Sequence, residues 1–226
     1  MEHPDIIGLA ASAEHYFNDG RKSAAALLSL VETDTCITTS EPWTMLEFAS
    51  GYGCVTHHFD AVAPEADVTA CDIHGRAVEF IQNVLSTNAV ISVRDPDHFW
   101  LRREFDIVFA LSFFSHMPAS TWSPWLKALF RHVRPGGSLI FTTHGHISRQ
   151  KLYRNMIDLD EHGFWFEASS EQADINVAEY GTTITSTEFV TRQIFAHLRA
   201  PSLWLRPVSG GDIRMFISSP GPSRRN

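Results

Sequence analysis

Short apolar runs alternate with amphipathic segments through the middle of the chain. Strand-like runs cover residues 43–49, 67–72, 89–93, 105–111 and 138–143, and helical periodicity covers 54–63, 74–85 and 123–133. The run 105–111 is apolar on both faces, which is typical of a central strand in a parallel sheet. Regular alternation of strands and helices predicts right-handed crossovers and a parallel, doubly wound sheet.

The two ends of the chain add further elements to this core. Helical pieces are predicted at 9–17 and 23–31, with the turn signal Asn18-Asp19-Gly20 between them. A helix is predicted from Thr187 to Leu198, begun by a capping box from Thr185 to Glu188. Two last strands, 203–208 and 213–218, flank a hairpin-type turn. The predicted fold is therefore α/β: a Rossmann-like, doubly wound, seven-stranded sheet in three α/β/α layers, mostly parallel with an antiparallel C-terminal hairpin strand.

Composition changes this picture little but excludes some functions. The 226 residues predict a single domain with one core, in which the irregular segment 144–188 forms a cap over the ligand end of the sheet. A formal charge of −8 argues against a protein that mainly grips nucleic-acid phosphates. Three cysteines without metal-site spacing, and a start that lacks the pattern of a secretory signal, predict a cytoplasmic protein. No apolar stretch has the length of a membrane span.

Candidate chemistry gathers where the predicted strands end, since ligands of such sheets bind at the carboxyl ends of the strands. The first strand ends with Glu47, and Gly51 and Gly53 follow before a helix. Asp72 ends the second strand, where an acid can accept hydrogen bonds from ribose hydroxyls. This pattern fits a dinucleotide, or S-adenosylmethionine, whose ammonium an acid can hold and which needs no third glycine. A glycine turn with incidental acids is the simpler alternative.

The order of motifs downstream resembles the class I S-adenosylmethionine-dependent methyltransferases. Phe105-Asp106 opens the fourth strand, and the following helix ends in the signature Arg131-His-Val-Arg-Pro-Gly-Gly137, where a glycine is expected to supply the C-cap. The resemblance covers roughly residues 40–145, although Ala49 stands where the family has its first glycine. It implies cofactor contacts from the glycine loop and the ends of strands two and four, namely Glu47, Phe48, Ala49, Ser50, Gly51, Gly53, Asp72, Ile73, Leu111 and Ser112.

The same resemblance assigns contacts to two further regions. The loop after the third strand lies over the adenine in this fold, so Asp95 is the first candidate, and Asp97 the second, to accept from the exocyclic amine. Residues 1–40 are expected to form a helical lid, with Tyr16 near the cofactor and Arg21 meeting its carboxylate. Solvated loop acids and a surface arginine are the simpler alternatives.

Three histidines follow strands four and five. Methyl transfer to a hydroxyl or an ammonium requires a base, and histidine titrates near neutral pH. His116, His144 and His146 are therefore the predicted catalytic residues, and the two in His-x-His are expected to point the same way. His116 could equally be a structural ring packed beside the cofactor. The three histidines could bind a metal, but no carboxylate or cysteine with ligand spacing supports this, so none is predicted.

The sequence thus predicts an enzyme that transfers methyl from S-adenosylmethionine to O or N of a small molecule. A looser resemblance, carried by segments such as SFFSHMP and AEYGTTITSTEFV, is to bacterial methyltransferases found near glycan and natural-product biosynthesis genes. Two alternatives stay open: a methyltransferase acting on a macromolecule, and a cofactor-binding module or subunit without catalysis.

Overall fold

The computed structural model describes residues 4–154, 156–169, 178–198, 202–207 and 212–218. They fall into two compact units, residues 1–92 and 93–226, which are described in turn. The strands of the main sheet follow the order β3-β2-β1 in the first unit and β4-β5-β9-β8 in the second. Seven strands, mostly parallel with an antiparallel C-terminal hairpin, are those that the sequence predicts.

The first unit has three parallel strands: β1 (Trp43–Phe48), β2 (Ala66–Asp72) and β3 (Asn88–Ile91). All but one of the β1 positions are buried, so its apolar run is a core strand. Helix α3 (Gly75–Val84) packs Val78 and Ile81 against Ala70 and Ala89 of the sheet. The predicted helix 54–63 is wrong in extent, because turns precede a short 3-10 turn, η1 (Thr56–His58), and one turn of helix, α2 (Phe59–Val62).

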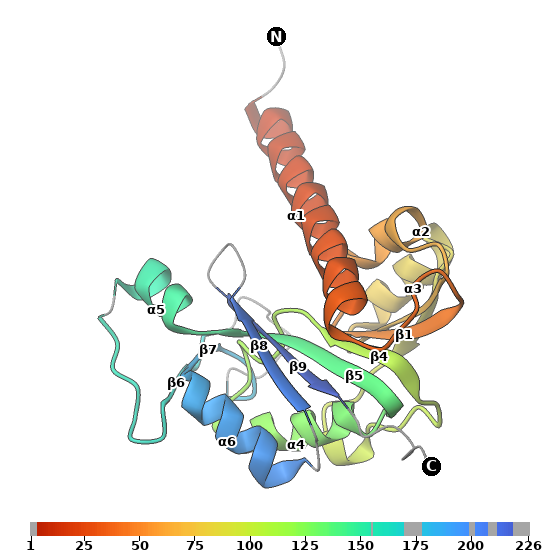
Figure 1. Ribbon diagram of the computed structural model, residues 1–226. Coiled ribbons are helices and arrows are strands. Elements are labelled where there is room, and N and C mark those ends of the chain that lie inside the picture. Colours follow the sequence, from red (N-terminus) through yellow and green to blue (C-terminus); the bar gives the residue numbers. More distant parts are fainter. Residues whose placement is uncertain (1–3, 155, 170–177, 199–201, 208–211, 219–226) are drawn as a thin grey trace, which may run out of the picture. The chain divides into compact units, whose positions relative to one another are not determined.

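The N-terminal segment is one continuous helix, α1 (Pro4–Asp34), and not the predicted pair (Figure 1). The turn signal at Gly20 has another cause. A Cβ at this position would overlap the backbone oxygen of Cys54, so glycine lets α1 approach the chain after β1. Gly20 is therefore needed for close packing, and it does not end the helix.

In the second unit, β4 (Phe105–Ala110) and β5 (Val133–His144) pair in parallel. Helix α4 (Ala119–Phe130) begins four residues earlier than predicted and accommodates Pro124 in its interior. Its buried side consists mainly of Trp122, Trp125, Leu126 and Leu129, at helical spacing. Burial of two indole rings on this face favours the helix despite the hydrogen bond that proline cannot donate.

The sequence predicts that the Pro-Gly-Gly segment after α4 caps the helix, but the structure shows that it does not. It lies inside β5, where the pairing register with β4 shifts between Phe105 and Ile107. A Cβ at Gly137 would lie 2.5 Å from the backbone oxygen of Asp106. The glycines therefore serve an irregularity in the sheet.

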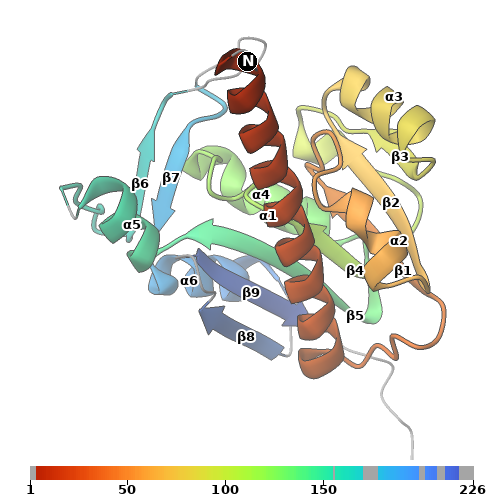
Figure 2. The same ribbon diagram turned by 90° about the horizontal axis from the view of Figure 1, so that it is seen from above.

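The remaining elements of the second unit follow β5. They are α5 (His146–Tyr153), β6 (Phe164–Glu167), β7 (Thr182–Thr185), α6 (Thr187–His197), β8 (Ser202–Pro207) and β9 (Asp212–Ser218). Strands β6 and β7 form a separate antiparallel pair, and β9 lies between β5 and β8 (Figure 2). Ser186 caps α6 by accepting from the Phe189 N–H, so the predicted capping box is displaced by one residue. The predicted turn at 209–212 lies mostly outside the described residues, and no described helix is long and apolar enough to cross a membrane.

Candidate active site

The acid at the end of β1 is buried and shares a hydrogen bond. Glu47 is 2% exposed, and its Oε2 accepts from the Thr56 hydroxyl at 2.6 Å. Burial raises the pKa of the Glu47 carboxyl to about 7, the Thr56 bond opposes this shift, and the nearby Asp72 carboxylate adds to it. Glu47 therefore changes charge close to neutral pH, where an approaching cation would favour its ionised form.

The loop after β1 turns sharply through left-handed residues. Ala49, Gly51 and Gly53 have φ of 57°, 55° and 79°. A Cβ at Gly53 would lie 2.7 Å from Leu85 of the segment after α3, whereas one at Gly51 would meet no atom within 4 Å. Gly53 is thus required by packing, and Gly51 leaves open space beside the loop. Ala49 stands where the resembled family has a glycine, and its left-handed conformation strains a residue that carries a Cβ.

Asp72 ends β2 and ties the two strand ends together. Its Oδ2 accepts from the Gly51 N–H at 2.8 Å, and its Oδ1 accepts from the His74 N–H at 2.9 Å. The same Oδ1 lies 2.8 Å from Nδ1 of His74. Asp72 is 5% exposed, and Ile73, which follows it, is half-buried. The structure therefore brings Glu47, the glycine loop and Asp72 together, as the sequence predicts.

Helix α1 contributes one predicted residue beside this loop and one away from it. The Cys54 thiol donates to the backbone oxygen of Tyr16 at 3.2 Å. Burial, and next the Cys54 thiol, raise the pKa of Tyr16 to about 12. Arg21 is exposed, and its guanidinium donates to Asn18 of the same helix at 2.9 Å. A contact between Arg21 and the cofactor carboxylate stays a prediction.

In the second unit, β4 ends at Ala110, earlier than the sequence predicts, and a tight turn follows. Leu111 is half-buried, and Ser112 has a φ of 58°. The Ser112 N–H donates to the Thr142 hydroxyl of β5 at 2.7 Å, and the Ser115 hydroxyl donates to the Ser112 oxygen at 2.8 Å. Pro118 follows this turn and is the N-cap residue of α4. The turn after β4 is therefore held rigidly from both sides.

His116 lies in this turn and is fastened to the segment before β7. Its Nδ1 lies 2.7 Å from the Gly181 oxygen, and the Gly181 N–H donates to the His116 oxygen at 3.0 Å. A carbonyl can only accept, so Nδ1 carries the proton and the neutral ring keeps its lone pair on Nε2. The imidazole stacks on Tyr180, with centroids 4.7 Å apart. Burial lowers the pKa of His116, the Gly181 bond opposes this, and His144 adds to the lowering.

The structure brings together two of the three predicted catalytic histidines. The rings of His116 and His144 are 6.0 Å apart. His146 is exposed at the start of α5, and Gly145 is the N-cap of that helix. The extended geometry expected for His-x-His is therefore wrong, because the chain changes from strand to helix between the two rings. Among the described residues, no group of three His, Cys, Asp or Glu side chains could hold a metal ion.

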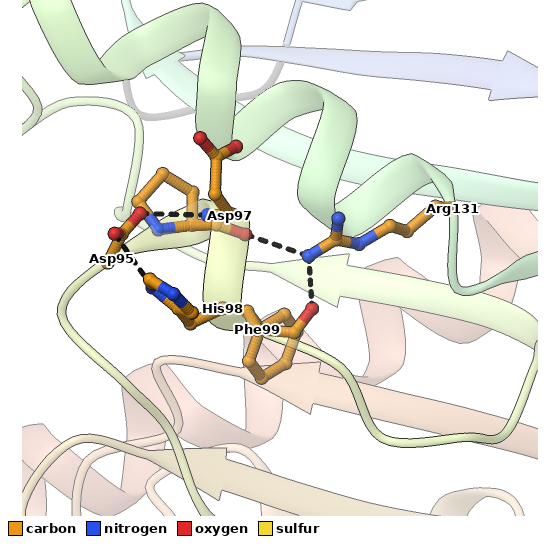
Figure 3. A network of polar contacts seen from close by, with 6 residues as sticks. Asp95, Asp97, His98, Phe99 and Arg131 are labelled. Carbon is orange, nitrogen blue, oxygen red and sulfur yellow. Dashed lines mark hydrogen bonds and ion pairs between the residues drawn. The ribbon is translucent and has the colours of Figure 1, made fainter.

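Of the two predicted acids in the loop after β3, one forms hydrogen bonds within the loop itself (Figure 3). Asp95 precedes the 3-10 turn η2 (Pro96–His98); its Oδ1 accepts from the Asp97 N–H at 2.9 Å, and its Oδ2 lies 2.8 Å from Nδ1 of His98. The Asp97 hydrogen bond lowers the pKa of the Asp95 carboxyl. Asp97 forms no side-chain hydrogen bond within the described part of the chain.

The first unit meets the chemical demands of S-adenosylmethionine. The hydroxyl of Ser50 is buried and has no partner among the described residues, and Gly51 faces open space. We expect the buried Glu47 carboxylate to meet the cofactor's ammonium and the Asp72 oxygens to accept from its ribose hydroxyls. Phe48, buried at 3%, supports the loop from the core.

Sequence reasoning missed two contributors and left a third open. Thr56 occupies the place of the third glycine in a GxGxxG pattern, so its sequence position does not indicate a polar contact. Its bond to Glu47 depends on the turn before η1. Gly181 is 65 residues from His116, and no local pattern indicates their contact. Tyr180 lies in the predicted cap, where the sequence suggests that it lines the acceptor site. In the structure its ring stacks on His116, the candidate base.

Part of the chain is similar to known methyltransferases. Residues 46–139 match a family model described as a methyltransferase domain. A malonyl-[acyl-carrier protein] O-methyltransferase of Bacillus cereus is 27% identical over 147 residues, which cover 65% of this chain and 53% of that protein. The corresponding protein of Bacillus anthracis is 26% identical over 64% of this chain and 52% of its own length. The chain spans about half the length of the curated relatives it matches.

Solved structures confirm the predicted fold. The "DhpI-SAM-HEP complex" has a TM-score of 0.59 and 18% identity, covering 92% of this chain and 96% of that one. DesVI of Streptomyces venezuelae has a TM-score of 0.61 and 15% identity, covering 98% of this chain and 99% of that one. The matched family uses S-adenosylmethionine, which confirms the predicted cofactor. Residues 46–139 are therefore similar to a methyltransferase domain, and the chain has the fold of class I methyltransferases.

Proposed function

We propose that this protein transfers the methyl group of S-adenosylmethionine to an oxygen or nitrogen of a small molecule, with His116 as the general base. The single observation that carries the proposal is the hydrogen bond from Nδ1 of His116 to the Gly181 oxygen. It fixes the tautomer in which Nε2 accepts a proton, and the lowered pKa keeps the ring neutral near pH 7. Nε2 of His116 has no hydrogen-bond partner among the described residues.

When bound, the cofactor supplies an electrophilic methyl group on a sulfonium and leaves as S-adenosylhomocysteine. We assign Glu47 to its ammonium and Asp72 to its ribose hydroxyls. His116 Nε2 takes the proton of an acceptor hydroxyl as its oxygen bonds to the methyl carbon and the sulfur–methyl bond breaks, whereas an acceptor ammonium loses its proton to Nε2 before its nitrogen attacks. The Gly181 carbonyl accepts a hydrogen bond from the other nitrogen and stabilises the imidazolium that forms. Glycan and natural-product precursors are the acceptor class that the sequence suggests.

The relatives favour a second acceptor. Their names describe O-methylation of a malonyl group on an acyl-carrier protein. A malonyl carboxylate is already ionised at neutral pH, so its methylation needs no proton acceptor. The two acceptor classes therefore make different demands on His116.

A labelled-methyl assay separates these possibilities. Wild type, His116→Ala and Asp72→Ala are compared on a metabolite extract and on malonyl-loaded carrier protein, with S-adenosylhomocysteine binding measured by calorimetry. We expect Asp72→Ala to lose binding, and His116→Ala to bind as wild type does while turnover on a hydroxyl or amine falls about 10²- to 10⁴-fold. Undiminished turnover of a carboxylate by His116→Ala would favour the second acceptor.

Two outcomes contradict the proposal. If both variants lose binding equally, His116 is a structural contact of the cofactor and not a base. If wild type binds S-adenosylhomocysteine but methylates no fraction of the extract and no carrier, the protein is a cofactor-binding module.

A further inference from the structure

The side chain of Tyr180 has no part in the function described so far, yet its ring lies face to face with the candidate base. The ring centroids of Tyr180 and His116 are 4.7 Å apart, and the angle between the ring planes is 8°. The ring of His144, by contrast, meets the same imidazole edge to face, at 69°. The phenol therefore presents its π face to one face of the imidazole.

The segment that carries Tyr180 is fastened on both sides of this residue. The carboxylate of Glu179, which precedes it, pairs with Arg94 at 3.4 Å. Gly181 follows, and a Cβ at this position would lie 2.1 Å from the backbone oxygen of Glu167 in β6. The backbone next to the phenol is therefore closely packed, with no room for a side chain on Gly181.

The strand that follows ties this segment to the residues on either side of His116. The Thr183 N–H donates to the Ser115 oxygen at 2.8 Å, and the Thr183 hydroxyl donates to the Met117 oxygen at 2.6 Å. Thr183 is fully buried, so water does not compete for these bonds. The base and the tyrosine thus belong to one hydrogen-bonded assembly, and the two rings are held together before any ligand binds.

The charge that His116 acquires when it takes a proton gives this stacking a chemical effect. An aromatic face attracts a cation through its quadrupole, and the attraction is larger where water is excluded. The other titratable group beside the ring, His144, acts in the opposite direction and lowers the pKa of His116. Glu179 contributes little net charge to this environment, because it pairs with Arg94. The phenol face is therefore a source of stabilisation for the imidazolium.

We propose that Tyr180 is a positioning residue whose ring face fixes the plane of the His116 imidazole and stabilises the imidazolium formed when Nε2 accepts the acceptor's proton. This inference rests on the proposed function, in which His116 is the base. Tyr180 takes no proton itself and acts through the ring of His116. The Gly181 carbonyl supports the imidazolium from within the ring plane, and the phenol supports it from one face, so two neighbouring residues serve one proton transfer.

The test is the titration of His116 in the protein without cofactor or acceptor, followed by NMR of isotope-labelled histidine. The His116 resonance is identified by its loss in His116→Gln. Tyr180→Phe keeps an aromatic face, so we expect the pKa of His116 to stay close to that of wild type. Tyr180→Leu keeps an apolar side chain without a π face, so the pKa should fall, and the acid dissociation constant of the imidazolium should rise about three- to tenfold.

The matched control is Tyr153→Leu, which removes another half-buried tyrosine of the same unit. Tyr153 packs edge to face on Trp165, with centroids 5.0 Å apart, and has no printed contact with the base. We expect this variant to leave the titration of His116 unchanged. Turnover of the extract fraction that wild type methylates should fall about tenfold in Tyr180→Leu and return in Tyr180→Phe.

Two results would overturn the inference. If leucine merely uncovered the imidazole, the pKa of His116 would rise, because burial lowers it. A pKa that rises or stays unchanged in Tyr180→Leu would therefore show that Tyr180 acts only by covering the ring. Wild-type turnover in Tyr180→Leu would contradict the positioning role.

A second measurement covers the case in which Tyr180→Leu does not fold. Phenylalanines with increasing numbers of ring fluorines at position 180 weaken the π face at nearly constant shape, so the pKa of His116 should fall as fluorines are added. A pKa independent of fluorination would overturn the inference. The titration requires no methyl transfer, so its outcome is distinct from that of the proposed function, which fails if His116→Ala keeps full turnover of a hydroxyl acceptor.

Discussion

Replacement of Glu47 by glutamine should stabilise the cofactor-free protein at alkaline pH and weaken cofactor binding. The pKa of Glu47 is raised from 4.5 to about 7, mainly by burial. A raised carboxyl pKa means that the folded state binds the proton more tightly than the unfolded state does. The ionised side chain therefore destabilises the fold. This effect is complete above pH 7 and disappears when the pH is far below 4.5.

The magnitude follows from the two pKa values. A pKa raised from 4.5 to about 7 corresponds to about 3 kcal/mol when Glu47 is ionised in both states. At pH 8.5 the penalty is about 3 kcal/mol, and at pH 5 it is about 1 kcal/mol. Glutamine has the same shape, carries no charge and retains an oxygen that accepts from the Thr56 hydroxyl.

Urea unfolding of wild type and Glu47→Gln without cofactor, at pH 5 and pH 8.5, measures this difference. We expect the stability advantage of the variant to grow by about 2 to 3 kcal/mol between the two pH values. The exposed Glu65→Gln removes the same charge from the surface and is the control for net charge. An advantage that does not change with pH would refute the reasoning, because it would show that the pKa of Glu47 is the same in the folded and unfolded states.

Three other substitutions test the loop, its contact with α1 and the candidate base. Gly53→Ala should destabilise by about 1 to 3 kcal/mol in thermal unfolding, since its Cβ meets Leu85 at a φ of 79°. Ala49→Gly should change stability by no more than about 1 kcal/mol, because the relief of a left-handed alanine offsets the added freedom of the unfolded chain. A larger effect at Ala49 than at Gly53 would contradict this account. Gly20→Ala should lower the melting temperature, because its Cβ overlaps the Cys54 oxygen; an unchanged temperature would show that α1 can shift. Wild-type turnover on a hydroxyl acceptor should fall as pH drops below 6.5 through the lowered pKa of His116, and a profile that stays flat to pH 5 would exclude a histidine base.

The sheet could be predicted from the sequence because its signals are local. Runs of apolar residues set β1, β2, β4 and β5, and turn residues separate them. The acids at the strand ends were found for the same reason, since Glu47 and Asp72 each end a buried run. Parallel neighbouring strands then bring those ends to one edge without information from elsewhere.

Glycines misled the sequence analysis where their role is packing. Gly20 and Gly137 were interpreted as a helix breaker and a helix cap, yet each lies where a Cβ would meet backbone oxygen of a distant segment. Composition cannot separate the two uses, because both need only the absence of a side chain. The partner, Cys54 in one case and Asp106 in the other, is known only from the fold.

The choice between Asp95 and Asp97 shows a second limit. Both acids stand in one short loop, and the resemblance favours the first. Whether a carboxylate is available depends on the backbone N–H groups around it, and here η2 directs one of them to Asp95. Local geometry, not residue type, therefore determines which of the two carboxylates already has a backbone partner.

For His116 the structure changes the question that the sequence poses. The sequence presents a structural ring and a general base as alternatives. The bond to the Gly181 carbonyl serves both, because it anchors the ring and also confines the proton to Nδ1. Tyr180 adds a flat surface that restricts rotation of the imidazole. A histidine held in this way is prepared for proton transfer at Nε2, so a structural role of one nitrogen is a condition for a catalytic role of the other.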